Sequence, residues 1–240
     1  MINEVRNTVL AILNKNNYGY ISPADFNLFA EQAQLDIFED YFYAYNYQVN
    51  KENARQSGTG YADLKKGYEE VIDLFSLTET LPQSSANVFS MPSQLTTGSD
   101  YYFINKVLCG TGLNEAERVG HSKITLLSQS LLTAPSSLYP AYTTESSLMT
   151  IYPDTYSTAG DVTCQYIRYP YTPKWTYINI TGGEPVFDQS QPDYQDFELP
   201  IDDQTDLTMK ILQYAGLSIR EEAIVGYSAQ QEQVENANEK

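Results

Sequence analysis

Residues 22–50 read SPADFNLFAEQAQLDIFEDYFYAYNYQVN, and this stretch predicts a long helix that begins at its first residues. Ser22 is a suitable N-cap, Pro23 favours the first helical position, and Asp25 stands where a capping box carries its carboxylate. Two apolar stripes follow, so the helix must be covered on more than one side, by the rest of the chain or by a neighbouring subunit. The first stripe holds Phe26, Phe29, Ala30, Ala33, Ile37, Tyr41 and Ala44, and the second holds Phe38, Phe42, Tyr45 and Val49. From the second stripe we take Phe38, Phe42 and Tyr45 as candidate subunit-interface residues.

Outward from this helix the chain divides into three zones. Residues 1–80 predict three helices, of which the last covers 61–77. Residues 81–191 are rich in proline and in short β-like runs, and residues 192–240 are helical again. Neither helical zone is long enough to build a large core alone. We therefore predict an α+β fold, in which the N- and C-terminal helical zones pack together and the β-rich zone is inserted as a sheet or sandwich.

The middle zone contains several candidate strands and turns. A loop over 153–160 between two of these strands suggests a hairpin, and Gly110-Thr-Gly112 suggests a turn, since the third glycine of a dinucleotide loop is missing. The candidate strands are 101–108, 123–127, 147–152, 162–169 and 175–180.

The C-terminal zone predicts two helices and a polar tail. Leu207 to Ala215 form the first helix, with Gly216 as its expected C-cap. Ser218 and Glu221 form a capping box for the second. This second helix carries an apolar stripe that a neighbour can cover, and the mainly polar residues 230–240 follow it. Its candidate subunit-interface residues are Ile219, Ile224 and Tyr227.

Charge restricts the classes of partner. The formal net charge of the 240 residues is −17, and no cluster of basic residues is longer than Lys65-Lys66. Specific DNA binding is therefore disfavoured, although an acidic surface can face DNA in a channel without adhering to it. The sequence also has no apolar run long enough for a membrane helix and no signal-peptide pattern at its start. We expect a protein without membrane insertion.

The sequence contains few patterns that would indicate catalysis or metal binding. His121 is the only histidine. No G-x-S-x-G nucleophile elbow accompanies it and neither cysteine has a recognisable family signature around it, so we interpret His121 as a loop or strand-end residue. Cys109 and Cys164 lie in strand-like apolar runs and are expected to be buried free thiols. The Asp202, Asp203 and Asp206 cluster suits a helix start better than a divalent-ion site. We predict no enzyme activity, no catalytic residue, no metal site and no cofactor.

Two phrases of the sequence resemble structural proteins of crAss-like phages and related short-tailed phages of Bacteroidota. The first runs from Gly19 through Phe42 to about Asn50, and its beginning reads GYISPADFNLFAEQAQLDIFEDYF. The second combines ELPI at Glu198 with KILQYAGLSIRE at 210–221. The middle zone carries no matching phrase, so its role stays open.

The resemblance implies a head-to-tail connector, similar to adaptors that form a twelvefold ring below the portal. It implies a homo-oligomer that contacts neighbouring portal, ring or tail proteins and surrounds genomic DNA without binding it specifically. The protein would be made in the host cytoplasm and would reside in the neck or tail of the virion.

A second hypothesis draws on the 21 tyrosines of the chain. Tyrosine is common at protein interfaces, and an equally good interpretation is a tyrosine-rich β surface and core. The alternative function is therefore a tail-associated attachment or glycan-binding protein that uses the tyrosine-rich β zone.

Overall fold

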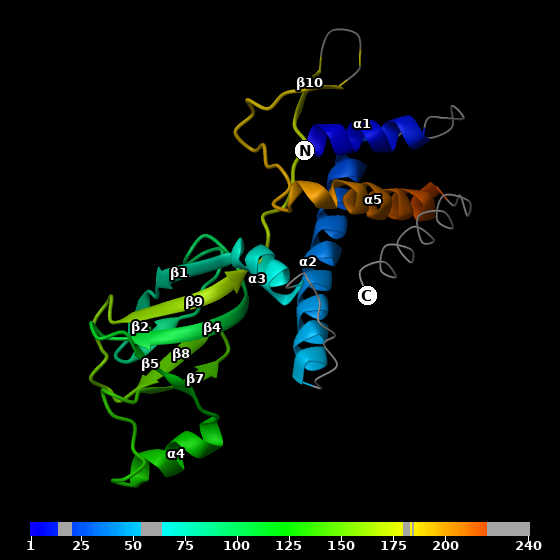
Figure 1. The fold of residues 1–240 in the computed structure, drawn as a ribbon. Coiled ribbons are helices and arrows are strands. Elements are labelled where there is room, and N and C mark those ends of the chain that lie inside the picture. Colours follow the sequence, from blue (N-terminus) through cyan, green and yellow to red (C-terminus); the bar gives the residue numbers. More distant parts are fainter. Residues whose placement is uncertain (14–20, 54–63, 180–182, 184, 220–240) are drawn as a thin grey trace. The chain divides into compact units, whose positions relative to one another are not determined.

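The computed structural model describes residues 1–13, 21–53, 64–179, 183 and 185–219 (Figure 1). It confirms the α+β class, with helices in both terminal parts of the chain and β-sheets between them. The chain forms two compact units. Residues 1–71 and 170–240 make up the helical unit, and residues 72–169 make up the β unit.

Three helices assemble the helical unit from the two ends of the chain. They are α1 (Ile2–Leu13), α2 (Pro23–Asn53) and α5 (Gln204–Ile219), and α5 packs on both α1 and α2. A shorter helix, α3 (Leu64–Asp73), crosses the boundary between the units in sequence. The buried apolar residues recur at helical spacing and include Ile2, Val5 and Val9 of α1, Phe26, Ala30, Ala33 and Ile37 of α2, and Leu207, Ile211, Leu212 and Ala215 of α5.

The start of α2 has the predicted capping geometry. The Ser22 Oγ accepts a hydrogen bond from the Asp25 N–H at 3.1 Å and donates to the Asp25 carboxylate at 2.6 Å. This pair satisfies one of the N–H groups that the first turn of a helix leaves without a partner. Pro23 occupies the first helical position, where its missing N–H costs nothing.

The predicted end of the C-terminal helix is wrong. Instead of stopping at Gly216, α5 continues through it to Ile219, and Ser218 therefore lies inside the helix rather than at the start of another. Gly216 is buried, so a residue without a side chain occupies a covered position of the helix instead of terminating it. The rest of the predicted final helix lies outside the described residues.

Residues 170–199 belong to the helical unit, although the sequence placed them in or beside the β-rich zone. This segment carries a two-stranded antiparallel ribbon, β10 (Tyr177–Asn179) with β11 (Pro185–Phe187). Its Trp175 is buried, and Phe197 and Leu199 are buried further along. At the other boundary, residues 76–80 form a strand of the β unit. The inserted unit therefore spans 72–169 rather than 81–191.

The β unit consists of two sheets that share one core. One sheet has the strand order β1-β9-β4-β5, and the other has the order β2-β3-β8-β7-β6, in which only β6 and β7 run parallel. The strands are β1 (Ser76–Thr80), β2 (Gln83–Ser85), β3 (Val88–Ser90), β4 (Tyr101–Cys109), β5 (Asn114–Glu115), β6 (Glu117–Arg118), β7 (Ala141–Glu145), β8 (Leu148–Tyr152) and β9 (Val162–Arg168).

Alternation along the strands builds this shared core. Val162, Cys164 and Tyr166 of β9 are buried with Met149 and Ile151 of β8, as period-two side-chain placement requires. These two strands belong to different sheets, so the predicted hairpin over 153–160 is wrong, and that loop instead connects one sheet to the other. The predicted turn at Gly110 is confirmed. Its φ of +69° suits glycine, and its carbonyl accepts from the N–H of Leu113.

One predicted strand is a helix. Residues 123–127 lie within α4 (His121–Gln129), which belongs to the connection between β6 and β7. Ile124 is buried and Leu127 is half-buried three residues later, whereas Leu126 is exposed, and this is a helical rather than an alternating pattern. Because parallel neighbours such as β6 and β7 cannot be joined by a tight turn, a longer crossover is required here.

Candidate functional site

Phe38 is not a subunit-interface residue of the folded chain, and this prediction is wrong. Its side chain is 0% exposed and lies in the core of the helical unit. The Phe42 ring packs against it edge to face, with ring centroids 5.0 Å apart. The second apolar stripe of α2 therefore begins inside the protomer, where the fold itself covers it.

Phe42 and Tyr45 are half-buried and lie further along the same stripe. The Tyr45 hydroxyl donates to the Glu69 carboxylate of α3 at 3.2 Å. One turn earlier, the Tyr41 ring meets the Tyr68 ring of α3 edge to face at 6.3 Å. Helix α3 thus already contacts the aromatic side of α2. Only the parts of the Phe42 and Tyr45 side chains that remain exposed could contact another subunit.

The C-terminal candidates fall at or beyond the end of the described chain. Ile219 is the last residue of α5. Ile224 and Tyr227 lie outside the described residues, so their role as interface residues stays a prediction.

Sequence reasoning missed the aromatic residues of α2 that face solvent. Tyr43 and Tyr47 are exposed, and they stand four residues apart, on one face of the helix. Both tyrosines lie outside the two apolar stripes, and from this position in the sequence their exposure could have been predicted. Other tyrosines, such as Tyr142, Tyr156 and Tyr166, are buried in the β unit, so this residue type serves both of the roles considered from composition.

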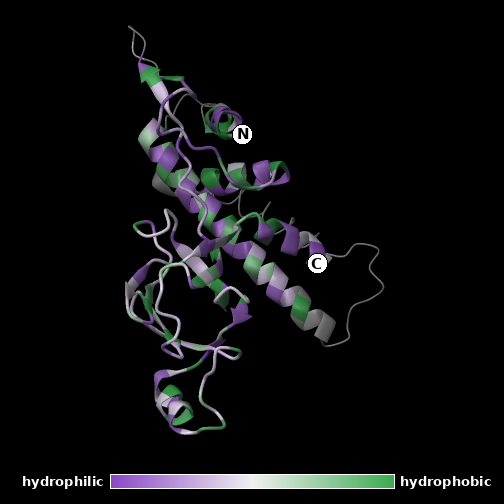
Figure 2. Ribbon diagram, turned by 90° about the vertical axis from the view of Figure 1, so that its left-hand side faces the viewer, coloured by the Kyte–Doolittle hydropathy of each residue, from purple (hydrophilic) through white to green (hydrophobic). Residues whose placement is uncertain are grey.

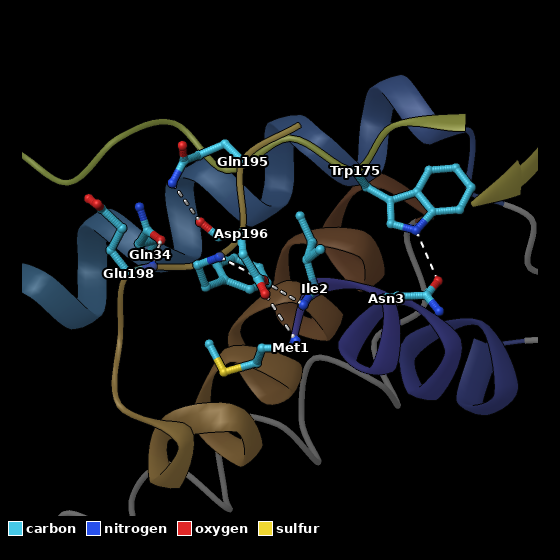
Figure 3. Close-up of polar contacts among 9 residues, drawn as sticks. Met1, Ile2, Asn3, Gln34, Trp175, Gln195, Asp196 and Glu198 are labelled. Carbon is cyan, nitrogen blue, oxygen red and sulfur yellow. Dashed lines mark hydrogen bonds and ion pairs between the residues drawn. The ribbon is translucent and has the colours of Figure 1, made fainter. Parts of the chain in front are cut away.

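A polar cluster ties residues 170–199 to the start of α1 (Figure 3). One Asp196 carboxylate oxygen accepts from the N–H of Ile2 at 2.8 Å and from the N–H of Phe197 at 2.9 Å. The other accepts from the Met1 ammonium at 3.1 Å. Asp196 therefore caps α1 from a position far along the chain, where a negative charge also favours the helix dipole.

Electrostatics at Asp196 follow from this geometry. Burial raises the pKa of its carboxyl, but the N–H donors of Ile2 and Phe197 and the terminal ammonium outweigh that effect, so the pKa lies below its ordinary value. The charged carboxylate is thus the form that the fold stabilises.

Trp175 is the second centre of this cluster. Its indole N–H donates to the Asn3 side chain at 3.1 Å, and its backbone exchanges hydrogen bonds with the Asn27 side chain. The Arg6 guanidinium lies 3.8 Å from the centre of the Trp175 ring, a cation–π distance. Tyr177 and Phe187 of the ribbon stack nearby. All of these contacts hold elements together, which is a structural role.

Gln34 repeats this pattern on α2. Its side-chain amide donates to the Tyr171 carbonyl at 2.9 Å, and its side-chain oxygen accepts from the Glu198 N–H at 3.1 Å. The side chain is buried, so both of its polar ends are satisfied by the backbone of the returning segment.

The residues weighed for catalysis, His121 and the two cysteines, lie in different environments. His121 is exposed at the start of α4, and its Nε2 contacts the Thr144 carbonyl at 3.1 Å, which makes that nitrogen the protonated one. Cys109 and Cys164 are free and buried, as predicted. Burial raises the pKa of each thiol to about 12, with an added contribution from the Asp161 charge at Cys109, so the nucleophilic thiolate is scarce at neutral pH.

The acidic cluster near residue 203 serves a helix start. Asp202 and Asp203 lie in the 3-10 turn η2 (Ile201–Asp203), and Asp206 lies in the first turn of α5. The Tyr41 hydroxyl donates to the Asp203 carboxylate. Among the residues that the structure describes, no three His, Cys, Asp or Glu side chains gather as a metal site.

The β unit contains a depression with a volume of about 410 Å³. It combines a half-buried aromatic ring, Tyr101, with a carboxylate, Asp100, and several serine hydroxyls. The lining residues are Met91, Pro92, Ser93, Asp100, Tyr101, Ser146 and Ser147.

A scan of the chain against models of protein families finds no match, and a search of curated proteins likewise returns no similar sequence. Within the described residues, none of the helices combines the length and the apolarity that a membrane span requires.

Proposed function

We propose that this chain is a structural subunit of a short-tailed bacteriophage, which forms a ring in the neck or tail between the portal and the tail. The observation that carries the proposal is where the two phage-like phrases lie in the fold. The first covers nearly all of α2 and the second covers most of α5, and these two helices pack together although they are far apart in sequence. The β unit is inserted between them and has its own core.

This arrangement suits a ring subunit for a physical reason. Both ends of the chain form the helical unit, and the inserted unit is joined to it by two chain connections. The sequence and size of the inserted unit can therefore change without disturbing the packing of the helices. The net charge of −17 suits a protein beside DNA that must pass without adhering, because phosphate contacts need basic side chains.

An amber mutation in the gene, with and without complementation, tests the proposal. Without the chain, we expect filled or leaking heads that lack tails, and complementation should restore infectious particles. Purified virions should also contain as many copies of the chain as other ring proteins of the neck have. Tailed particles of normal yield made without the chain would contradict the proposal.

The depression at Tyr101 supports a second candidate function, that of an attachment protein that binds glycans. Sugar sites commonly pair an aromatic face with a few fixed polar groups, and Tyr101, Asp100 and the neighbouring serines supply both. A glycan-array assay with the full-length chain tests this function, using Tyr101→Ala as the variant. Binding that this substitution abolishes would favour attachment over the ring.

A further inference from the structure

The connection between β6 and β7 buries little of its apolar content. Helix α4, which lies in this connection, is attached through Val119 and Ile124, which are buried with Ala141 and bordered by Leu127 and Tyr152. Helix α4 lies at one end of the β unit (Figure 1), and hydrophobic residues are visible on it in Figure 2. Only one side of the helix is therefore covered by its own unit.

Beyond that contact lies a concentration of exposed apolar side chains, here named the leucine segment (residues 126–139). Scattered exposed leucines are ordinary, but several within one short segment indicate an interaction surface. Leu131 is fully exposed and Leu132 is 96% exposed. The exposed large residues of the segment are Leu126, Leu131, Leu132, Leu138 and Tyr139.

The charge of this region is opposite to that of the chain. Residues 118–144 contain Arg118, His121 and Lys123 but no Asp or Glu, whereas the whole chain carries −17. All three basic side chains are exposed. A surface that matches the leucine segment must therefore offer apolar area together with negative charge.

The chain itself contains such a surface. Residues 175–209 hold eight acidic residues and no Lys, Arg or His. Within them, Ile201 is 74% exposed at the turn η2, and the exposed Asp202 follows directly. This acidic turn (Ile201 and Asp202) thus combines an apolar side chain with negative charge.

We propose that the leucine segment of one copy docks on the acidic turn of a second copy of this chain. The two surfaces differ, so the contact is heterologous, and a heterologous contact generates a ring when its rotation closes. The inference rests on the proposed function, because it names the neighbour that each ring subunit would contact.

Sedimentation velocity of the full-length chain over a range of concentrations tests the apolar part. The wild type should self-associate, and Leu131→Ser with Leu132→Ser should raise the dissociation constant about tenfold or more, because both substitutions remove apolar area that the contact would bury. Leu95→Ser is the matched control, because Leu95 is 98% exposed in the same β unit but lies outside the segment. The control should associate like the wild type.

A charge exchange tests the partner surface. Lys123→Glu alone and Asp202→Lys alone should each weaken association by about three- to fivefold, in the range of exposed ion pairs. The two together should recover most of the loss, because attraction is restored with its sign reversed. This arm stays informative even if the serine variant misfolds, which circular dichroism would reveal.

Three results would overturn the inference: a wild type that stays monomeric at every concentration, a serine variant that associates normally, or a charge exchange without recovery. If the serine variant associates normally but no longer enters particles, the leucine segment binds a different partner. The ring function could still stand in that case, because the amber mutant tests it independently.

Discussion

Replacement of Trp175 by alanine should destabilise the helical unit severely. The indole is buried, donates to Asn3 of α1, lies under Arg6 and stacks with Tyr177 and Phe187. Truncation of a buried Trp costs about 3–5 kcal/mol. Loss of the indole hydrogen bond and of the cation–π contact adds about 1–2 kcal/mol. We therefore expect a loss of about 4–7 kcal/mol, a large share of the roughly 5–15 kcal/mol that stabilises a domain.

Urea unfolding followed by far-ultraviolet circular dichroism measures this loss, because the helical signal comes mainly from the unit that contains Trp175. Tyr43→Ala is the matched control, since Tyr43 is an exposed aromatic residue of the same unit, and it should change stability by less than about 0.5 kcal/mol. A loss below about 1 kcal/mol for Trp175→Ala would refute the claim that this side chain joins the returning segment to α1 and α2.

Four further predictions concern other parts of the chain. Asp196→Asn should cost about 1 kcal/mol at neutral pH. Because the pKa of Asp196 is depressed, the difference from the wild type should shrink as the pH falls below about 4, in urea titrations at several pH values; a difference constant down to pH 2 would contradict the assignment. Cys109 and Cys164 should resist a thiol reagent in the native protein and react only on unfolding, whereas rapid native labelling would disprove their burial. Replacement of residues 72–169 by a glycine-serine linker should leave a helical product that melts cooperatively, and a product without helical signal would show that the helical unit cannot fold alone. His121→Ala should leave infectivity intact, and loss of a hydrolytic activity in normally assembled particles would overturn the structural interpretation.

Local chemistry explains which parts of the fold the sequence could predict. The Ser22–Asp25 cap is an interaction within one turn, so the four residues 22–25 were enough to predict the start of α2. The same logic failed at Gly216, where tertiary packing of a buried glycine overrides its usual role as a helix stop. Residues 123–127 were too short a run to distinguish strand from helix by composition.

Long-range contacts explain the rest. Trp175 belongs to the helical unit because of Asn3, Arg6 and Asn27, none of which lies near it in sequence. Likewise, the periodicity of α2 showed that Phe38 needed a cover but not that the chain itself supplies it. An apolar stripe defines a surface to be buried, and only the assembled fold decides whether a neighbouring element or another subunit buries it.

A reconstruction of the intact phage particle by electron cryomicroscopy tests the central claim most directly. We predict density for α1, α2 and α5 in the wall of a ring between portal and tail, with DNA passing through its centre and the β unit attached to that wall. Density for the chain in a tail fibre, or its absence from the particle, would contradict the account.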